Sequence, residues 1–295
     1  DAKLEYLKKA GVEISTSLDG PKELHDKYRN LRNGKSAYDE FMNRVGKVKE
    51  LWGQGSLSPL LTITKEHLGK MESVIDEYLS LGVRGIFLRA LNPYGMAKKE
   101  WDELGYSIED FVECFKNTLE YILEINKKGT YFPEFYSTLL FRRIMTPFST
   151  GFVDLQSPAG CGTSGVIYDY NGNVYPSDEA RMLARVGDEA FCMGNVHRNT
   201  YEELFLKSDL PYWIEKTLVE SMPGCSTCAW QVYCGSDPVR NYVESGNIVG
   251  HKTMSEFCYK HKSIIDHIFH LIRNDPETEE VFWSWVNNRP LARGE

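Results

Sequence analysis

A chain of 295 residues is long enough for one large domain or two medium ones, each with a hydrophobic core. Its composition, 42% hydrophobic and 26% charged, is that of a globular protein, and no stretch approaches the roughly 20 apolar residues of a membrane helix. The net charge of −8 argues against a nucleic-acid partner, because binding phosphates requires a basic surface. No basic and apolar leader opens the sequence, so we expect a cytoplasmic protein with neither a membrane nor a nucleic acid as partner.

The first part of the chain, residues 1–150, alternates expected strands and helices. The strands are predicted at residues 12–17, 60–64 and 85–90, and the helices at residues 37–51, 71–78, 107–128 and 134–146. Strand–helix repeats of this length predict parallel strands with right-handed crossovers, which defines an α/β fold. The sequence begins at Asp1, in what is predicted to be the end of a helix, and we expect a fragment of a longer protein.

From about residue 151 to residue 295 the pattern changes to short apolar runs separated by turn residues. Asn171-Gly172 lies between two expected strands, residues 166–170 and 173–175, and predicts a hairpin. Helices are expected near residues 200–206, over residues 261–273, and from Pro276 onward, with Asp275 as the N-cap. The pattern predicts a second, small α+β domain that begins near residue 150.

Four of the seven cysteines form one pattern: Cys225, Cys228, Cys234 and, further along, Cys258. Four thiolates saturate either an iron–sulfur cluster or a zinc ion. Zinc ribbons usually pair two Cys-x-x-Cys knuckles, and only one is present here. The spacing alone therefore gives an iron–sulfur cluster and a zinc ion about equal weight. Buried or unligated thiols are the third alternative.

The cysteine spacing resembles the C-terminal SPASM domain of radical S-adenosylmethionine enzymes. In that family the three central cysteines and the last one hold an auxiliary [4Fe–4S] cluster, and all four are present here. The other auxiliary cluster of the family draws on three positions, which in this sequence are Cys161, Ser177 and Pro238. The resemblance therefore implies a protein that has kept one auxiliary cluster and lost the other.

The N-terminal part resembles the same family. Residues 14–21, Ile-Ser-Thr-Ser-Leu-Asp-Gly-Pro, look like the fourth strand of the radical enzyme barrel with its loop, and residues 88–95 look like the end of the sixth. Ligands of parallel barrels lie at the C-terminal ends of the strands, so the resemblance makes Ser17 and Arg89 candidate contacts of S-adenosylmethionine. Ser17 could equally be a turn residue, and Arg89 could form a structural ion pair.

More narrowly, residues 154–162, 173–183 and 233–239 resemble the radical maturases of His-Xaa-Ser peptide systems. The family's Cys-x-x-x-Cys-x-x-Cys motif, which binds the first [4Fe–4S] cluster with S-adenosylmethionine, does not occur in this sequence. The resemblance thus implies the C-terminal half of a (β/α) barrel, residues 1–150, followed by a SPASM domain, residues 151–295. We expect an oxidoreductase as the intact protein and no activity from this chain alone.

The resemblance implies a ribosomally made precursor peptide as substrate, and it makes a second, paired radical maturase a candidate partner. Asp178 matches an aspartate that is the proposed base in sulfatase-maturing relatives, although a turn carboxylate paired with Arg181 is slightly favoured at this position. The rival hypothesis is a non-catalytic peptide-binding module with a structural four-cysteine site for zinc or iron–sulfur.

Overall fold

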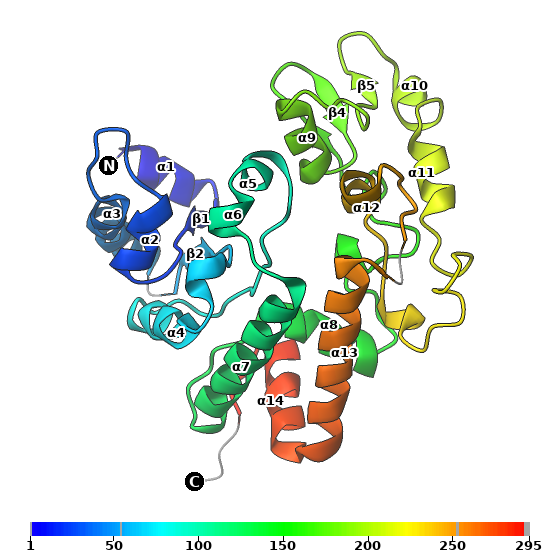
Figure 1. Cartoon of the computed structure of the whole chain (residues 1–295). Helices are drawn as coiled ribbons and strands as arrows, with labels where there is room; N and C mark the ends of the chain where they lie inside the picture. Colours follow the sequence, from blue (N-terminus) through cyan, green and yellow to red (C-terminus); the bar gives the residue numbers. More distant parts are fainter. Residues whose placement is uncertain (1, 54, 252–253, 292–295) are drawn as a thin grey trace. The chain divides into compact units, whose positions relative to one another are not determined.

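The computed structural model describes residues 2–53, 55–251 and 254–291 (Figure 1). The chain forms two compact units, both discontinuous: unit 1 is Asp1–Leu91, Glu109–Thr138 and His270–Glu295, and unit 2 is Asn92–Ile108 and Leu139–Phe269. The predicted boundary near residue 150 is therefore not the division into compact units, and as a division into functional domains it stays a prediction. Within the described part of the chain, every helix is too short or too polar to cross a bilayer.

The described residues of unit 1 form two strands and most of the long helices. Its elements are α1 (Ala2–Lys9), β1 (Ile14–Ser17), α2 (Lys22–Tyr28), α3 (Ala37–Trp52), β2 (Leu57–Leu60), η1 (Lys65–His67), α4 (Met71–Ser80), α7 (Ile108–Lys127) and α14 (Pro276–Val286). Two further helices, α8 (Phe135–Met145) and α13 (Glu256–Asn274), contain points at which the division between the units falls.

Parallel pairing organises the first half of unit 1. Strands β1 and β2 pair in parallel over four residues each, and single parallel bridges then join Ile63 to Ala90 and Ile86 to Glu134. Four chain segments thus follow one another in parallel, with α3, α4 and α7 as the connections between them. The predicted α/β class is confirmed, whereas the assignment of these segments to half of a barrel stays a prediction.

Two expected strands differ from the observed ones. The strand predicted at residues 60–64 lies at Leu57–Leu60, and the segment predicted at residues 85–90 forms only the isolated bridges. The apolar pattern continues past β2 because the chain changes partner there: Leu18 N–H donates to Leu60 O, but Ile63 N–H donates to Arg89 O.

Helix α7 was predicted at residues 107–128 and spans Ile108–Lys127. Its apolar face is buried, since Phe115, Leu119 and Ile122 have no exposed surface. The last helix, α14, starts as predicted at Pro276, and the Asp275 side chain accepts hydrogen bonds from the backbone N–H groups of the first turn.

Helix α14 belongs to unit 1 because its residues bond to α7. Trp285 Nε1 donates to Asn126 Oδ1 at 3.0 Å, and Lys127 forms an ion pair of 2.8 Å with Asp275. These long-range contacts explain why the unit is discontinuous in sequence.

Unit 2 is built from short elements. They are α5 (Gly95–Lys99), α6 (Trp101–Leu104), η2 (Val153–Leu155), β3 (Ile167–Tyr168), β4 (Asn173–Tyr175), α9 (Asp178–Arg185), β5 (Gly194–Asn195), α10 (Tyr201–Phe205), α11 (Leu210–Lys216), η3 (Gln231–Tyr233) and α12 (Pro238–Ser245). The antiparallel sheet has the order β3-β4-β5, which confirms the predicted hairpin. Gly172 supplies the positive φ, 86°, that the turn requires.

Candidate metal centre and active-site residues

The loop between α11 and α12 carries three of the four cysteines of the predicted metal centre. Cys225 and Cys228 lie in successive turns, and Cys228 N–H donates to Cys225 O at 2.9 Å. Cys234 ends the short helix η3, where its N–H donates to Gln231 O at 3.2 Å. All three residues are half-buried, so each thiol is held by local turns without being sealed inside the unit.

The fourth cysteine lies on the helix against which this loop packs. Helix α13 begins five residues earlier than predicted, so Cys258 lies in its first turn, where Cys258 N–H donates to Ser255 Oγ at 3.1 Å. The rings of Trp230 and Tyr233 contact Phe269 of α13, with centroids 5.2 and 5.4 Å apart. The loop with the first three cysteines therefore packs on the same helix, α13, that carries Cys258.

The chain directly after Cys234 is closely packed. A Cβ at Gly235 would lie 2.4 Å from Asp154 O, so only glycine fits at this place. Two cations lie within electrostatic reach of Cys234: burial lowers the pKa of Arg143 and lowers that of Lys260 to about 8, and Cys234 opposes both shifts. Nearby cations favour a thiolate, which is the form that ligates metals.

Across the described residues, no three His, Cys, Asp or Glu side chains are gathered closely enough to hold a metal ion. The four half-buried thiols lie on one loop and on the helix against which this loop packs. Their chemistry fits a soft metal or an iron–sulfur cluster, and the metal centre stays a prediction.

The positions implied for a second auxiliary cluster are used to begin helices. Ser177 is the N-cap of α9, and its Oγ accepts from Ala180 N–H at 3.2 Å. Pro238 is the first residue of α12, after the N-cap Asp237. The remaining cysteine, Cys161, has a pKa raised to about 12, first by burial and then by Asp237, so its thiol is protonated at neutral pH.

We therefore expect Cys161→Ala to leave the iron content of reconstituted protein unchanged. Ser177 and Pro238 offer no soft donor, and a single protonated thiol cannot hold a cluster. Iron and acid-labile sulfide, measured per chain after anaerobic reconstitution, test this expectation. A loss of about four irons per chain would show that Cys161 belongs to a cluster with other ligands.

Asp178 is the first residue of α9, three residues after the end of the strand that follows the hairpin turn. Its side chain is 54% exposed and accepts from Arg181 at 2.7 Å, which is the pairing favoured from the sequence. The placement follows from Ser177, which caps a short helix that the prediction missed.

The two candidate contacts of S-adenosylmethionine follow different parallel segments of unit 1. Ser17 ends β1 and lines a cavity of about 900 Å³ together with His25 and Arg29. Arg89 is exposed, and its guanidinium lies 5.2 Å from the ring centroid of Phe87. The segment from β2 to Ile63 pairs with β1 on one side and with Ala90 on the other. The roles of Ser17 and Arg89 stay predictions.

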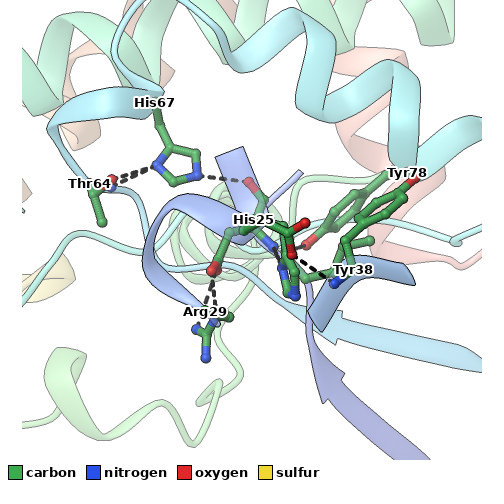
Figure 2. Close-up of polar contacts among 9 residues, drawn as sticks. His25, Arg29, Tyr38, Thr64, His67 and Tyr78 are labelled. Atoms are coloured by element: carbon green, nitrogen blue, oxygen red, sulfur yellow. Dashed lines mark hydrogen bonds and ion pairs between the residues drawn. The ribbon is translucent and has the colours of Figure 1, made fainter. Parts of the chain in front are cut away.

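The loop after Ser17 is held by side chains that the sequence did not single out (Figure 2). His67 donates from Nε2 to Asp19 O at 2.7 Å, and its Nδ1 accepts from Thr64 N–H at 3.0 Å, which fixes the tautomer. Tyr78 OH donates to Leu18 O at 2.6 Å.

Two further side chains complete this network (Figure 2). The Asp19 carboxylate pairs with Arg29, and Asp19 N–H donates to His25 Nδ1 at 3.2 Å. Burial lowers the pKa of His25 and of His67, so both imidazoles are neutral near pH 7. The position of Ser17 is thus set by a buried network from α2, η1 and α4. Of the side chains in this network, only Asp19 belongs to the motif of residues 14–21.

Comparison with known proteins finds no family model that matches the chain. In sequence, the chain is 24% identical over 273 residues to the cysteine-type anaerobic sulfatase-maturating enzyme of Clostridium novyi (strain NT). The alignment covers 89% of this chain and 66% of that protein, so the chain spans just under two thirds of its relative's length.

Solved structures of anSMEcpe share the fold. Native anSMEcpe with bound AdoMet has a TM-score of 0.73 and 17% identity, and the match covers 97% of this chain and 72% of that chain. Native anSMEcpe with bound AdoMet and the Kp18Cys peptide has a TM-score of 0.74, also at 17% identity, over the same shares. At 17% identity these structures show a shared fold, and the narrower His-Xaa-Ser assignment stays a prediction.

Proposed function

We propose that this chain is the part of a radical S-adenosylmethionine peptide-modifying enzyme that carries an auxiliary [4Fe–4S] cluster. The observation that carries the proposal is the similarity to an anaerobic sulfatase-maturating enzyme along 89% of the chain. The four-cysteine pattern adds to it, because the same stretch of sequence supplies a complete set of cluster ligands. In this proposal the intact protein is an oxidoreductase of the cytoplasm.

The cluster would be held by Cys225, Cys228, Cys234 and Cys258, and when bound it would supply a site for an electron from the substrate. Arg143 and Lys260 lie within electrostatic reach of Cys234 and would stabilise its thiolate. The packing of Trp230 and Tyr233 on Phe269 would keep the loop close to the helix that carries the fourth ligand.

Ser17 and Arg89 would contact S-adenosylmethionine, which the intact protein would bind together with a second [4Fe–4S] cluster. Hydrogen bonds from His67 and Tyr78 to the carbonyls after Ser17 would hold the hydroxyl in place without an ordering cost on binding. A positioned hydroxyl orients its ligand better than a mobile one, which is the contribution of the protein to cofactor chemistry.

The substrate would be a peptide. Two of the solved structures with this fold are described with bound peptides, Kp18Cys and Cp18Cys. By the resemblance of the C-terminal stretch, the natural substrate would be a ribosomally made precursor of the His-Xaa-Ser kind, and a second, paired maturase would be a partner.

We expect purified chain of this sequence to form no 5′-deoxyadenosine from S-adenosylmethionine with a strong reductant. The sequence contains no Cys-x-x-x-Cys-x-x-Cys motif to hold the cluster that reduces the cofactor. The measurement is chromatography of the reaction mixture against a blank without protein, and the longer protein that includes the upstream coding sequence is the comparison. Reductant-dependent product above the blank from this chain would contradict the expectation.

A further inference from the structure

Helices α5, α9 and α12 line a cavity of about 560 Å³ that the proposed chemistry does not use. This volume is in the range of ligand pockets, about 300–1,000 Å³. The helices all belong to unit 2, so the cavity lies within one compact unit. Its lining includes Tyr94, Lys98, Lys99, Leu183, Val186 and Tyr242.

The deepest part of this cavity is apolar. Tyr94 and Leu183 are 1% and 5% exposed, so both side chains lie in the interior of the unit. The Tyr94 OH donates to Asp237 Oδ2 at 3.3 Å. The hydroxyl therefore already has a partner, and an apolar group that enters the cavity would not leave it unsatisfied.

Exposed apolar side chains continue this surface along α9. Met182 and Val186 are four residues apart, which places them on one face of the helix, and they are 37% and 46% exposed. Helix α5 contacts α9, and a Cβ at Gly95 would lie 3.8 Å from Met182 Cε. An apolar strip therefore leads from the surface beside α5 to the interior, and its burial by a ligand would be favourable.

The rim of the cavity carries two lysines. Lys98 and Lys99 are the exposed last residues of α5, and neither forms an ion pair within the part of the chain that the structure describes. One carboxylate, Asp188, also lines the cavity. It accepts from Ala190 N–H at 3.1 Å, and its charge raises the pKa of Tyr242, so it has partners on its own wall. Two unpaired cations beside an apolar strip favour an acidic ligand with apolar side chains.

A basic ligand is the alternative, because Glu100, Asp102 and Glu103 follow the two lysines in the sequence. These three acidic residues are not among those that line the cavity. A basic ligand would have to lie against Lys98 and Lys99 to reach the apolar interior, and the like charges would repel each other. The lining therefore favours the acidic ligand.

We propose that this cavity docks an acidic segment of the precursor peptide, outside the residues that are modified. Apolar side chains of the segment fill the cavity, and its carboxylates pair with Lys98 and Lys99. The inference rests on the proposed function for the identity of the peptide, whereas the binding itself requires neither a cluster nor S-adenosylmethionine. A docking site of this kind holds the substrate on the protein and raises its effective concentration for the reaction.

The test is direct binding to the purified chain, measured by the fluorescence anisotropy of the labelled peptide Glu-Asp-Leu-Phe-Glu-Leu-Glu. We expect saturable binding at about 50 mM salt that weakens several-fold at about 300 mM, because exposed charges are screened. Two matched probes separate the contributions: one has lysine at every acidic position, and the other has serine at every apolar position. Each should bind at least about tenfold more weakly than the acidic probe.

The variant Lys98→Glu/Lys99→Glu should weaken binding of the acidic probe by about 10- to 30-fold, because two attractions become two repulsions. Val186→Glu, at an exposed position of the apolar strip, should weaken it by about tenfold. The matched control is Lys35→Glu/Lys128→Glu, which changes the net charge equally at exposed lysines that do not line the cavity. It should stay within about twofold of wild type. Circular dichroism of each variant checks the fold.

Unchanged affinity in Lys98→Glu/Lys99→Glu, or tighter binding of the lysine probe, would overturn the proposal. Wild-type chain that does not bind the acidic probe at about 1 mM would overturn it as well. If such a chain sediments as a dimer that Val186→Glu converts to a monomer, a second copy of the chain occupies the cavity instead. Probe binding by a chain that takes up no iron on reconstitution would support the docking site and contradict the proposed function alone.

Discussion

Replacing Glu134 with alanine is expected to lower the free energy of unfolding by about 3 kcal/mol. The Glu134 side chain has no exposed surface. Its carboxylate accepts backbone N–H groups from Leu88 at 3.0 Å, Tyr136 at 3.1 Å and Ser137 at 2.6 Å. Alanine would leave three donors buried without an acceptor. Each loss costs about 1–3 kcal/mol, and the relief of a buried carboxyl, whose pKa burial raises, offsets part of it.

The matched variant is Glu134→Gln. Both N–H groups from Leu88 and Tyr136 reach the same oxygen, Oε1, which an amide retains. In glutamine an NH₂ group replaces Oε2, so the Ser137 N–H would lose its acceptor and face another donor. The expected loss in the free energy of unfolding is about 1–2 kcal/mol. Glu120→Gln, on the exposed face of α7, controls for the change of charge. Urea unfolding followed by circular dichroism measures all three, and a Glu134→Ala midpoint equal to that of wild type would contradict the expectation.

The double variant Cys225→Ala/Cys228→Ala is expected to bind almost no iron after anaerobic reconstitution, compared with about four irons per chain for wild type. The two remaining ligands, Cys234 and Cys258, cannot supply the four thiolates that a [4Fe–4S] cluster needs. Loss of the broad visible absorption of the cluster should accompany loss of the metal.

Cys192→Ala is the matched control, since Cys192 is half-buried in unit 2 but outside the four-cysteine pattern. It should keep the full iron content of wild type. Iron retained by the double variant, or lost equally from both variants, would show that the cluster ligands had been assigned wrongly.

The elements that the sequence predicts best are those whose signals are local. Helix α7 has an apolar face with period 3.6, and it lies within one residue of its expected bounds. Helix α14 starts where the Asp275-Pro276 pair predicts. The hairpin at Asn171-Gly172 follows from turn chemistry alone.

The missed elements are short and depend on their caps. Helices α9 and α12 have only eight residues each and begin at Ser177 and Asp237, whose side chains accept the first N–H groups. The Ser177 cap was a readable signal, and it would have placed Asp178 and Glu179 on different faces of a helix.

The remaining differences arise from long-range contacts that no local pattern encodes. His67 and Tyr78 reach the loop after Ser17 from elsewhere in the chain, and Glu134 bonds to a strand segment 46 residues earlier. The hydrogen bond from Trp285 to Asn126 brings α14 back to unit 1, which a division at a single boundary cannot represent.

The central claim is that the four-cysteine pattern holds an iron–sulfur cluster of a peptide-modifying enzyme. The most direct measurement is metal analysis of the chain, reconstituted anaerobically with iron and sulfide in the presence of competing zinc. The account predicts about four irons and four sulfides per chain, with the electron paramagnetic resonance signal of a [4Fe–4S]⁺ cluster on reduction. One tightly bound zinc per chain with no iron would contradict it, and would favour a peptide-binding module with a structural metal site.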